Sequence, residues 1–154
     1  MKAAEITDRL IEELCAGRFR HARLNYANGD MVGHTGHLVA SVIAVEAVDL
    51  QLGRLLRVIA RLGGALIVTA DHGNCDDMFE RGKGGDVLLD EEGRPKPKTS
   101  HTLNRVPFYV YAPGADLRLA AAVAEPGLAN LAATVLQLLG FEAPADYAPS
   151  LLAR

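Results

Sequence analysis

Three short segments of the chain carry residues whose types and spacing could bind a metal ion. Asp30 and His34 are four positions apart, Asp71 and His72 are adjacent after an apolar run, and His101 stands in the segment Lys-Thr-Ser-His-Thr. One helical turn would place the first two on one side, although the neighbouring glycines make a tight loop at least as good an interpretation. Carboxylate oxygen together with imidazole nitrogen suits manganese, zinc or iron, whereas magnesium alone prefers oxygen ligands.

Each of these features also has an ordinary structural interpretation. An aspartate that follows a strand, as Asp30 does in this interpretation, more often caps a helix or forms a turn. His37 is interpreted as structural or as a support for a ligand. Cys75 lies close in sequence to the adjacent acid and imidazole, but mixed oxygen and nitrogen ligation does not require it. Asp76 and Asp77 are interpreted as part of a solvated loop, so the residue types alone leave the choice open.

Helical patterns surround these segments. Apolar residues at helical spacing predict helices over residues 3–16, 38–62 and 128–139. The segment 80–99 is charged and rich in Gly and Pro, which predicts an exposed loop.

Strand patterns alternate with the helices. We expect strands within 19–27, 65–70 and 106–111, and the nearly all-apolar run at 65–70 is typical of a strand buried on both faces of a parallel sheet. The alternation predicts an α/β sheet covered by helices. Ligands collect at the carboxyl ends of strands in such sheets, and both Asp30 and Asp71 are expected at such ends.

Composition narrows the class of protein. A chain of 154 residues with 49% hydrophobic and 23% charged residues fits one domain with a packed core. No apolar run reaches membrane-spanning length, no signal-peptide pattern opens the chain, and two cysteines favour a reducing cytoplasm over a secreted scaffold. A net charge of −3 argues against nucleic acid as the main partner. It does not exclude a phosphorylated ligand, because bound divalent cations would reverse the local sign.

Three motifs follow one another in a particular order. Asn-Tyr-Ala-Asn-Gly-Asp-Met-Val-Gly-His occupies 25–34, Thr-Ala-Asp-His-Gly-Asn occupies 69–74, and Thr-Ser-His-Thr-Leu-Asn occupies 99–104. This series resembles the carboxyl-terminal part of the cofactor-independent phosphoglycerate mutases, which belong to the alkaline phosphatase superfamily. The resemblance extends from about Thr7 to the end of the chain. It implies a three-layer α/β/α alkaline-phosphatase-like domain, of which residues 1–154 would be the carboxyl-terminal part.

The resemblance also implies a set of metal ligands. Two divalent ions, commonly Mn²⁺, share one site in that family and act in the interconversion of 3-phosphoglycerate and 2-phosphoglycerate through a phosphoserine. By motif, Asp30, His34 and His101 look like the ligands of one ion. Asp71 and His72 look like half of the ligand set of the other, which an early aspartate and the nucleophilic serine complete.

This chain departs from the family pattern in what it lacks. The early aspartate, the nucleophilic serine and the inserted substrate domain are absent, and neither Ser41 nor Ser100 occupies the motif of the nucleophile. We therefore expect a carboxyl-terminal fragment that is inactive alone, and that associates through an exposed sheet edge or with an amino-terminal half. The alternatives are a piece of another phosphomutase or phosphodiesterase of the superfamily, a non-catalytic metal-binding or interaction module, and one chain of a split enzyme.

Overall fold

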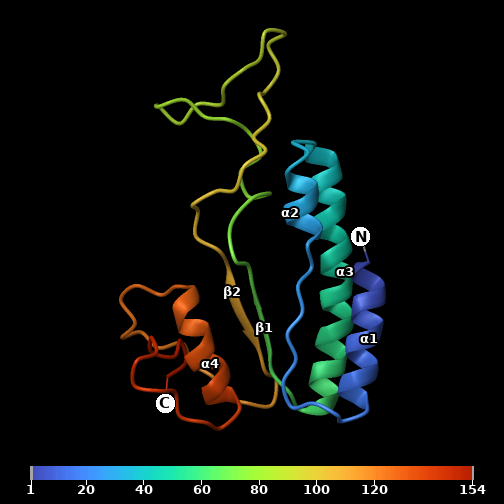
Figure 1. The fold of residues 1–154 in the computed structure, drawn as a ribbon, viewed down its shortest axis with the longest axis vertical. Coiled ribbons are helices and arrows are strands. Elements are labelled where there is room, and N and C mark those ends of the chain that lie inside the picture. The colour runs from blue at the N-terminus through green and yellow to red at the C-terminus, as the bar shows by residue number, and fades with distance from the viewer. Residues whose placement is uncertain (1, 154) are drawn as a thin grey trace.

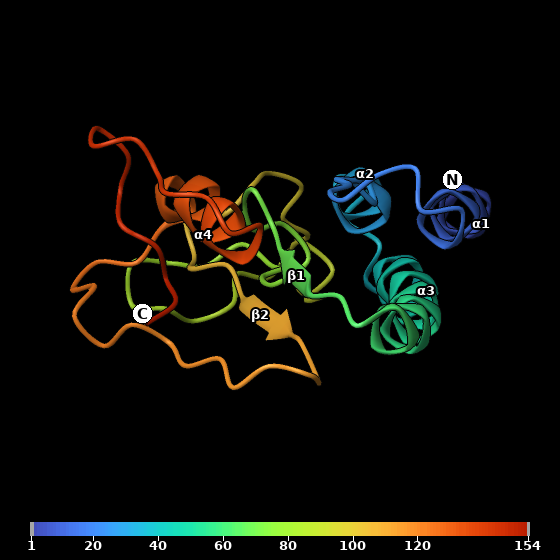
Figure 2. The same cartoon turned by 90° about the horizontal axis from the view of Figure 1, so that it is seen from below.

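The computed structural model describes residues 2–153 as helices on both sides of a two-stranded sheet (Figures 1 and 2). In both views α1, α2 and α3 lie on one side of β1 and β2, and α4 lies on the other. This is the layer order expected of an α/β/α domain, reduced to a small sheet. The elements in chain order are α1 (Ala3–Cys15), α2 (Asn28–Gly33), α3 (Leu38–Leu62), β1 (Leu66–Thr69), β2 (Phe108–Tyr111), the 3-10 helix η1 (Leu128–Asn130) and α4 (Leu131–Leu138).

Helix α3 has the bounds that its apolar spacing predicts, because both of its ends are capped. At its start, the Nδ1 atom of His37 accepts a hydrogen bond from the backbone N–H of Ala40 at 3.2 Å. At its end, Gly63 adopts a left-handed conformation with φ of 64°, and the N–H of Gly64 donates to the carbonyl of Ile59 at 3.0 Å. His37 therefore caps a helix, which confirms its structural interpretation.

Helix α1 packs against α3 through a small core. Leu55 on α3 is only 2% exposed and Thr7 on α1 is fully buried. The hydroxyl of Thr7 donates to the carbonyl of Ala3 at 2.7 Å and shares a hydrogen bond of 2.6 Å with the hydroxyl of Tyr26. This second contact fastens the segment that precedes α2 to α1 and so helps to fix the start of α2.

The expected strand within 19–27 is wrong. The segment is extended and mostly exposed, and it forms no ladder with any strand in the described part of the chain. Its apolar residues alternate poorly, and β1 pairs with another partner, so no neighbouring strand supplies the hydrogen bonds that would define a ladder. Asp30 consequently lies in the first turn of α2 rather than at a strand end.

The two strands pair antiparallel, so the expectation of a parallel sheet is also wrong. Leu66 lies opposite Tyr111 and Thr69 opposite Phe108. All four residues of β1 are half-buried rather than fully buried. The chain leaves the carboxyl end of β1, makes a long excursion and returns into β2 from that same end, which makes the pair antiparallel.

The excursion contains residues 78–98, which we call the ribbon arm. The exposed loop predicted for this region is indeed exposed, but it has internal pairing. Isolated bridges join Phe79 to Pro97, Arg81 to Val87 and Leu89 to Pro95. The arm projects beyond the helices in Figure 1. No helix among residues 2–153 is both long enough and apolar enough to cross a membrane.

Candidate metal centre

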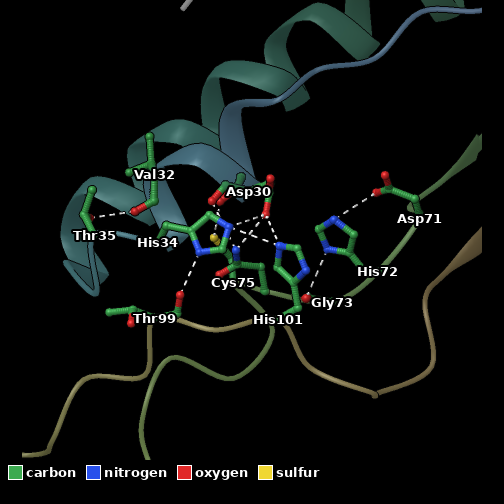
Figure 3. A network of polar contacts seen from close by, with 12 residues as sticks. Asp30, Val32, His34, Thr35, Asp71, His72, Gly73, Cys75, Thr99 and His101 are labelled. Atoms are coloured by element: carbon green, nitrogen blue, oxygen red, sulfur yellow. Dashed lines mark hydrogen bonds and ion pairs between the residues drawn. The ribbon is translucent and has the colours of Figure 1, made fainter.

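Three donor atoms from two distant parts of the chain meet at one point (Figure 3). The Nε2 atom of His101 lies 3.0 Å from Oδ1 of Asp30 and 3.1 Å from Nε2 of His34. The third side of the triangle, between Nε2 of His34 and Oδ1 of Asp30, measures 3.2 Å. The structure thus brings together the three residues that the resemblance assigns to one ion.

Helix α2 places two of these donors on one side. Asp30 is in its first turn, and His34 follows its last residue, so the separation of four positions spans one turn. Of the two interpretations that the sequence left open, the helical turn is the observed one. His101 reaches the same point from the segment between the ribbon arm and β2.

A backbone carbonyl fixes the tautomer of His34. Its Nδ1 atom lies 2.7 Å from the carbonyl oxygen of Thr99. A carbonyl can only accept, so Nδ1 is the nitrogen that donates, and Nε2 is the nitrogen left to face the centre of the triangle, where in this tautomer it presents a lone pair. A partner that fixes the ring in this way is typical of a metal-binding histidine.

The carboxylate of Asp30 is held in its anionic form. The side-chain amide of Asn74 donates to Oδ1 of Asp30 at 2.8 Å. This hydrogen bond lowers the pKa of Asp30; partial desolvation opposes it, and the nearby His34 and His101 reinforce it. Asp30 is therefore a carboxylate at neutral pH, as a metal ligand must be.

The donor set fits a divalent ion of the manganese, iron or zinc type. Ligand atoms about 2.1 Å from an ion lie about 3.0 Å apart in octahedral geometry and about 3.4 Å apart in tetrahedral geometry. The three observed separations of 3.0, 3.1 and 3.2 Å fall between these values. Their side chains are 35% to 46% exposed, so solvent or a further ligand can reach the open side.

The second predicted pair lies next to this cluster but does not form a three-ligand group within residues 2–153. Nε2 of His72 is 3.7 Å from Oδ1 of Asp71, whose side chain is 73% exposed. The ring of His72 stacks on that of His101, with centroids 3.6 Å apart and planes inclined by 19°. The stacked rings make the two predicted ligand sets neighbours (Figure 3).

Further residues of the loop after β1 support the centre without belonging to the triangle. The carboxylate of Asp76 accepts hydrogen bonds from the Thr102 hydroxyl at 2.9 and 3.1 Å and from the Asn104 amide at 2.6 Å. Asp76 is therefore a structural tie beside His101, not only part of a solvated loop. The Cys75 thiol donates to the carbonyl of Gly29 at 2.9 Å and is not among the converging donors.

Sequence reasoning missed Asn74 and Thr99, although both stand inside the quoted motifs. The motif Asp-His-Gly-Asn includes Asn74, and an amide beside a predicted ligand pair was the available signal. Thr99 acts through its backbone carbonyl, so its side-chain type carries no signal.

Sequence comparison matches nearly the whole of this chain to part of several longer proteins. The 2,3-bisphosphoglycerate-independent phosphoglycerate mutase of Trypanosoma brucei brucei is 47% identical over 154 residues, which are 99% of this chain and 28% of that protein. A probable enzyme of the same name from Arabidopsis thaliana is 47% identical over 154 residues, with the same shares covered. The chain thus spans about 28% of the length of these relatives.

The fold and a family model agree with these matches. Leishmania mexicana phosphoglycerate mutase, in crystal structures at low cobalt concentration, is similar with a TM-score of 0.96 and 47% identity, over 99% of this chain and 28% of that one. The model of the Metalloenzyme superfamily matches residues 1–143. With the converging Asp30, His34 and His101, these matches show that the chain belongs to the Metalloenzyme superfamily.

Proposed function

We propose that this chain is the carboxyl-terminal, metal-binding portion of a cofactor-independent phosphoglycerate mutase, an isomerase of glycolysis in the cytoplasm. The reaction would interconvert 3-phosphoglycerate and 2-phosphoglycerate through a phosphoserine. The names of the relatives and the fold of the solved mutase support this proposal. The observation that carries it is the convergence of Asp30, His34 and His101 on one point.

The proposed site holds two divalent ions, which we assign as Mn²⁺. Asp30, His34 and His101 would bind one ion, and Asp71 and His72 would contribute to the other. The Leishmania mutase was crystallised at low cobalt concentration, and cobalt is another divalent ion that accepts oxygen and nitrogen ligands. When bound, such ions neutralise phosphate oxygens and favour a serine alkoxide.

The residues of this chain prepare the site in two ways. Asn74 helps to keep Asp30 anionic, and the carbonyl of Thr99 fixes the His34 tautomer, so both donors are ready to bind. The nucleophilic serine would come from outside the chain. The hydroxyl of Ser41 is buried on α3 without a hydrogen-bond partner among residues 2–153, and Ser100 precedes His101 in the proposed ligand segment.

The large exposed surface of the chain supports the proposal that a further portion of the mutase packs against it. A folded monomer of 16.4 kDa is expected to expose about 7,500 Å², whereas this chain exposes 10,646 Å². The excess includes apolar side chains along α3, namely Val39, Val42, Ile43, Val45 and Leu50. We propose that an amino-terminal portion of the mutase, in the same polypeptide or in a separate chain, covers this surface. Without it, copies of the chain would associate.

Metal binding tests the proposed site directly. Isothermal titration with Mn²⁺ is expected to show that His34→Ala weakens binding by more than about 100-fold, because the variant removes one of three converging ligands. His21→Ala is the matched control, since it removes an exposed imidazole outside the cluster. Equal affinities for the wild type and His34→Ala would overturn the assignment.

Catalysis tests the proposed division of the enzyme. The chain alone is expected to show no interconversion of 2- and 3-phosphoglycerate, because the nucleophilic serine is supplied from elsewhere. Mixing it with the remaining portion of a mutase relative is expected to produce activity that His34→Ala abolishes. Turnover by the isolated chain at the level of an intact relative would contradict the proposal.

A further inference from the structure

We infer that Asn74 is a positioning residue of the metal centre, whose side-chain amide sets the orientation of the Asp30 carboxylate. The inference rests on the proposed role of Asp30 as a metal ligand and adds to it a residue that binds no ion itself. Asn74 stands in the loop after β1, 44 positions from Asp30, so the contact joins two separate segments of the site.

The amide of Asn74 makes two hydrogen bonds to the same residue. Its Nδ2 atom donates to Oδ1 of Asp30 at 2.8 Å and to the backbone carbonyl of Asp30 at 3.1 Å. Both partners can only accept, so the nitrogen rather than the oxygen of the amide must face Asp30. One amide therefore holds both the backbone and the side chain of the predicted ligand.

The surroundings of Asn74 preserve this orientation. Asn74 is only 6% exposed, and its own Oδ1 atom is buried with no hydrogen-bond partner among the described residues. A Cβ atom at Gly33 would overlap the Asn74 side-chain carbonyl, so glycine at this position of α2 leaves room for the amide. The side chain is thus placed so that its amide nitrogen donates both hydrogen bonds to Asp30, while its amide oxygen remains without a donor.

The orientation matters because Oδ1 of Asp30 is the oxygen that faces both imidazoles. It lies 3.0 Å from Nε2 of His101 and 3.2 Å from Nε2 of His34. The terminal torsion of an aspartate has broad preferences and does not fix the carboxylate by itself. The hydrogen bond from Asn74 restricts that rotation and keeps Oδ1 at its corner of the triangle, beside both imidazole nitrogens.

Mn²⁺ affinity separates this role from a merely structural one. Isothermal titration of the full chain, at a temperature where circular dichroism shows every variant folded, is expected to give about 10–100-fold weaker binding for Asn74→Leu. Asn74→Ala is expected to lose less but still measurably, because a water molecule that enters the space can donate to Asp30 without fixing the orientation of its carboxylate. Gln51→Leu removes a half-buried amide on α3 that accepts a hydrogen bond from Arg54, away from the cluster, and the variant is expected to bind Mn²⁺ like the wild type.

Three outcomes are decisive. Unchanged Mn²⁺ affinity in a folded Asn74→Leu variant, even with a lower melting temperature, would overturn the inference and leave Asn74 a structural residue. If Asn74→Leu does not fold, unchanged affinity in Asn74→Ala has the same meaning. Failure of the wild type itself to bind Mn²⁺ would instead refute the proposed function on which the inference rests.

Discussion

The donors of the metal centre depend on neighbours that do not touch the proposed ion. His34 is oriented by the carbonyl of Thr99, and Asp30 by the amide of Asn74. His101 is followed directly by Thr102, which is 6% exposed and donates to Asp76. At the residue scale, the candidate site therefore consists of a few proposed ligands and a larger set of hydrogen bonds that orient them.

Asp76 gives a prediction about stability and pH. Partial desolvation acts to raise the pKa of Asp76, but hydrogen bonds from Asn104 and Thr102 outweigh it, so the pKa is lowered from 3.8. A carboxylate with a lowered pKa stabilises the folded state above its unfolded pKa, and this contribution is lost as the pH falls through the folded value. Asp76→Asn is therefore expected to lower the urea midpoint at pH 7, with a difference from the wild type that shrinks below about pH 4.

The dependence of the urea midpoint on pH also shows which result would contradict this prediction. A constant difference between the wild type and Asp76→Asn from pH 7 to pH 3 would show that the ionised carboxylate contributes nothing. Asp116→Asn is a suitable control, because Asp116 is an exposed carboxylate whose contact with Arg118 lies away from the metal centre.

The sequence pointed to the side chains that converge, Asp30, His34 and His101, but not to the residues that support them. The spacing of Asp30 and His34 limits them to a turn or a tight loop, and both would aim the two groups together. The contact of Asn74 with Asp30 spans 44 positions and depends on the close approach that Gly33 allows. Such a tertiary contact has no local pattern, so residue spacing could not reveal it.

At the scale of elements, the spacing of apolar residues predicted those helices and strands whose structure depends on neighbouring residues in the sequence. The helix at 38–62 has the predicted bounds, and the strands at 65–70 and 106–111 were found with slightly shorter ones. The strand predicted within 19–27 was wrong because a strand needs a neighbouring strand to pair with, and the described residues supply none beside this segment. Strand direction was also wrong, since it depends on the path of the excursion between β1 and β2 rather than on the apolar run itself.

Helix α3 gives a prediction about packing. Leu55 is 2% exposed and is the largest fully buried side chain, so Leu55→Ala is expected to lower the free energy of unfolding by about 2–5 kcal/mol. Leu50 lies on the same helix but is 69% exposed, and Leu50→Ala is expected to change stability by less than about 0.5 kcal/mol. Chemical denaturation followed by circular dichroism measures both. Similar losses for the two variants would mean that α3 is not packed as described.

At the scale of the whole molecule, the accessible surface exceeds that of a typical monomer by about 3,000 Å². The exposed apolar side chains of α3 contribute to this excess, and a contiguous exposed apolar patch is typical of an interaction region. Helices α1 and α2 cover only part of α3, so Val39 and Ile43 are left 62% and 61% exposed. These two side chains lie one helical turn apart. The layered fold is thus present, but one side of it is left without cover.

This surface predicts self-association of the isolated chain. Light scattering is expected to give a mass above 16.4 kDa for the wild type and a smaller species when Val39→Glu and Ile43→Glu are combined. Leu89→Glu is the control, because Leu89 is 60% exposed but lies on the ribbon arm. A strictly monomeric wild type would contradict the prediction. Retention of the larger mass in the double variant would assign the contact to the strand edges instead.

The ribbon arm has a practical consequence for following the centre in solution. Its inner end leads into Thr99, whose carbonyl holds His34, while its outer turn includes the exposed Gly84 and Gly85. Exposed turns with small residues tolerate insertions and labels. A fluorophore attached at position 84 would lie on an exposed turn 17 positions before His101, so it would replace none of the converging donors, and its emission is expected to report ion uptake.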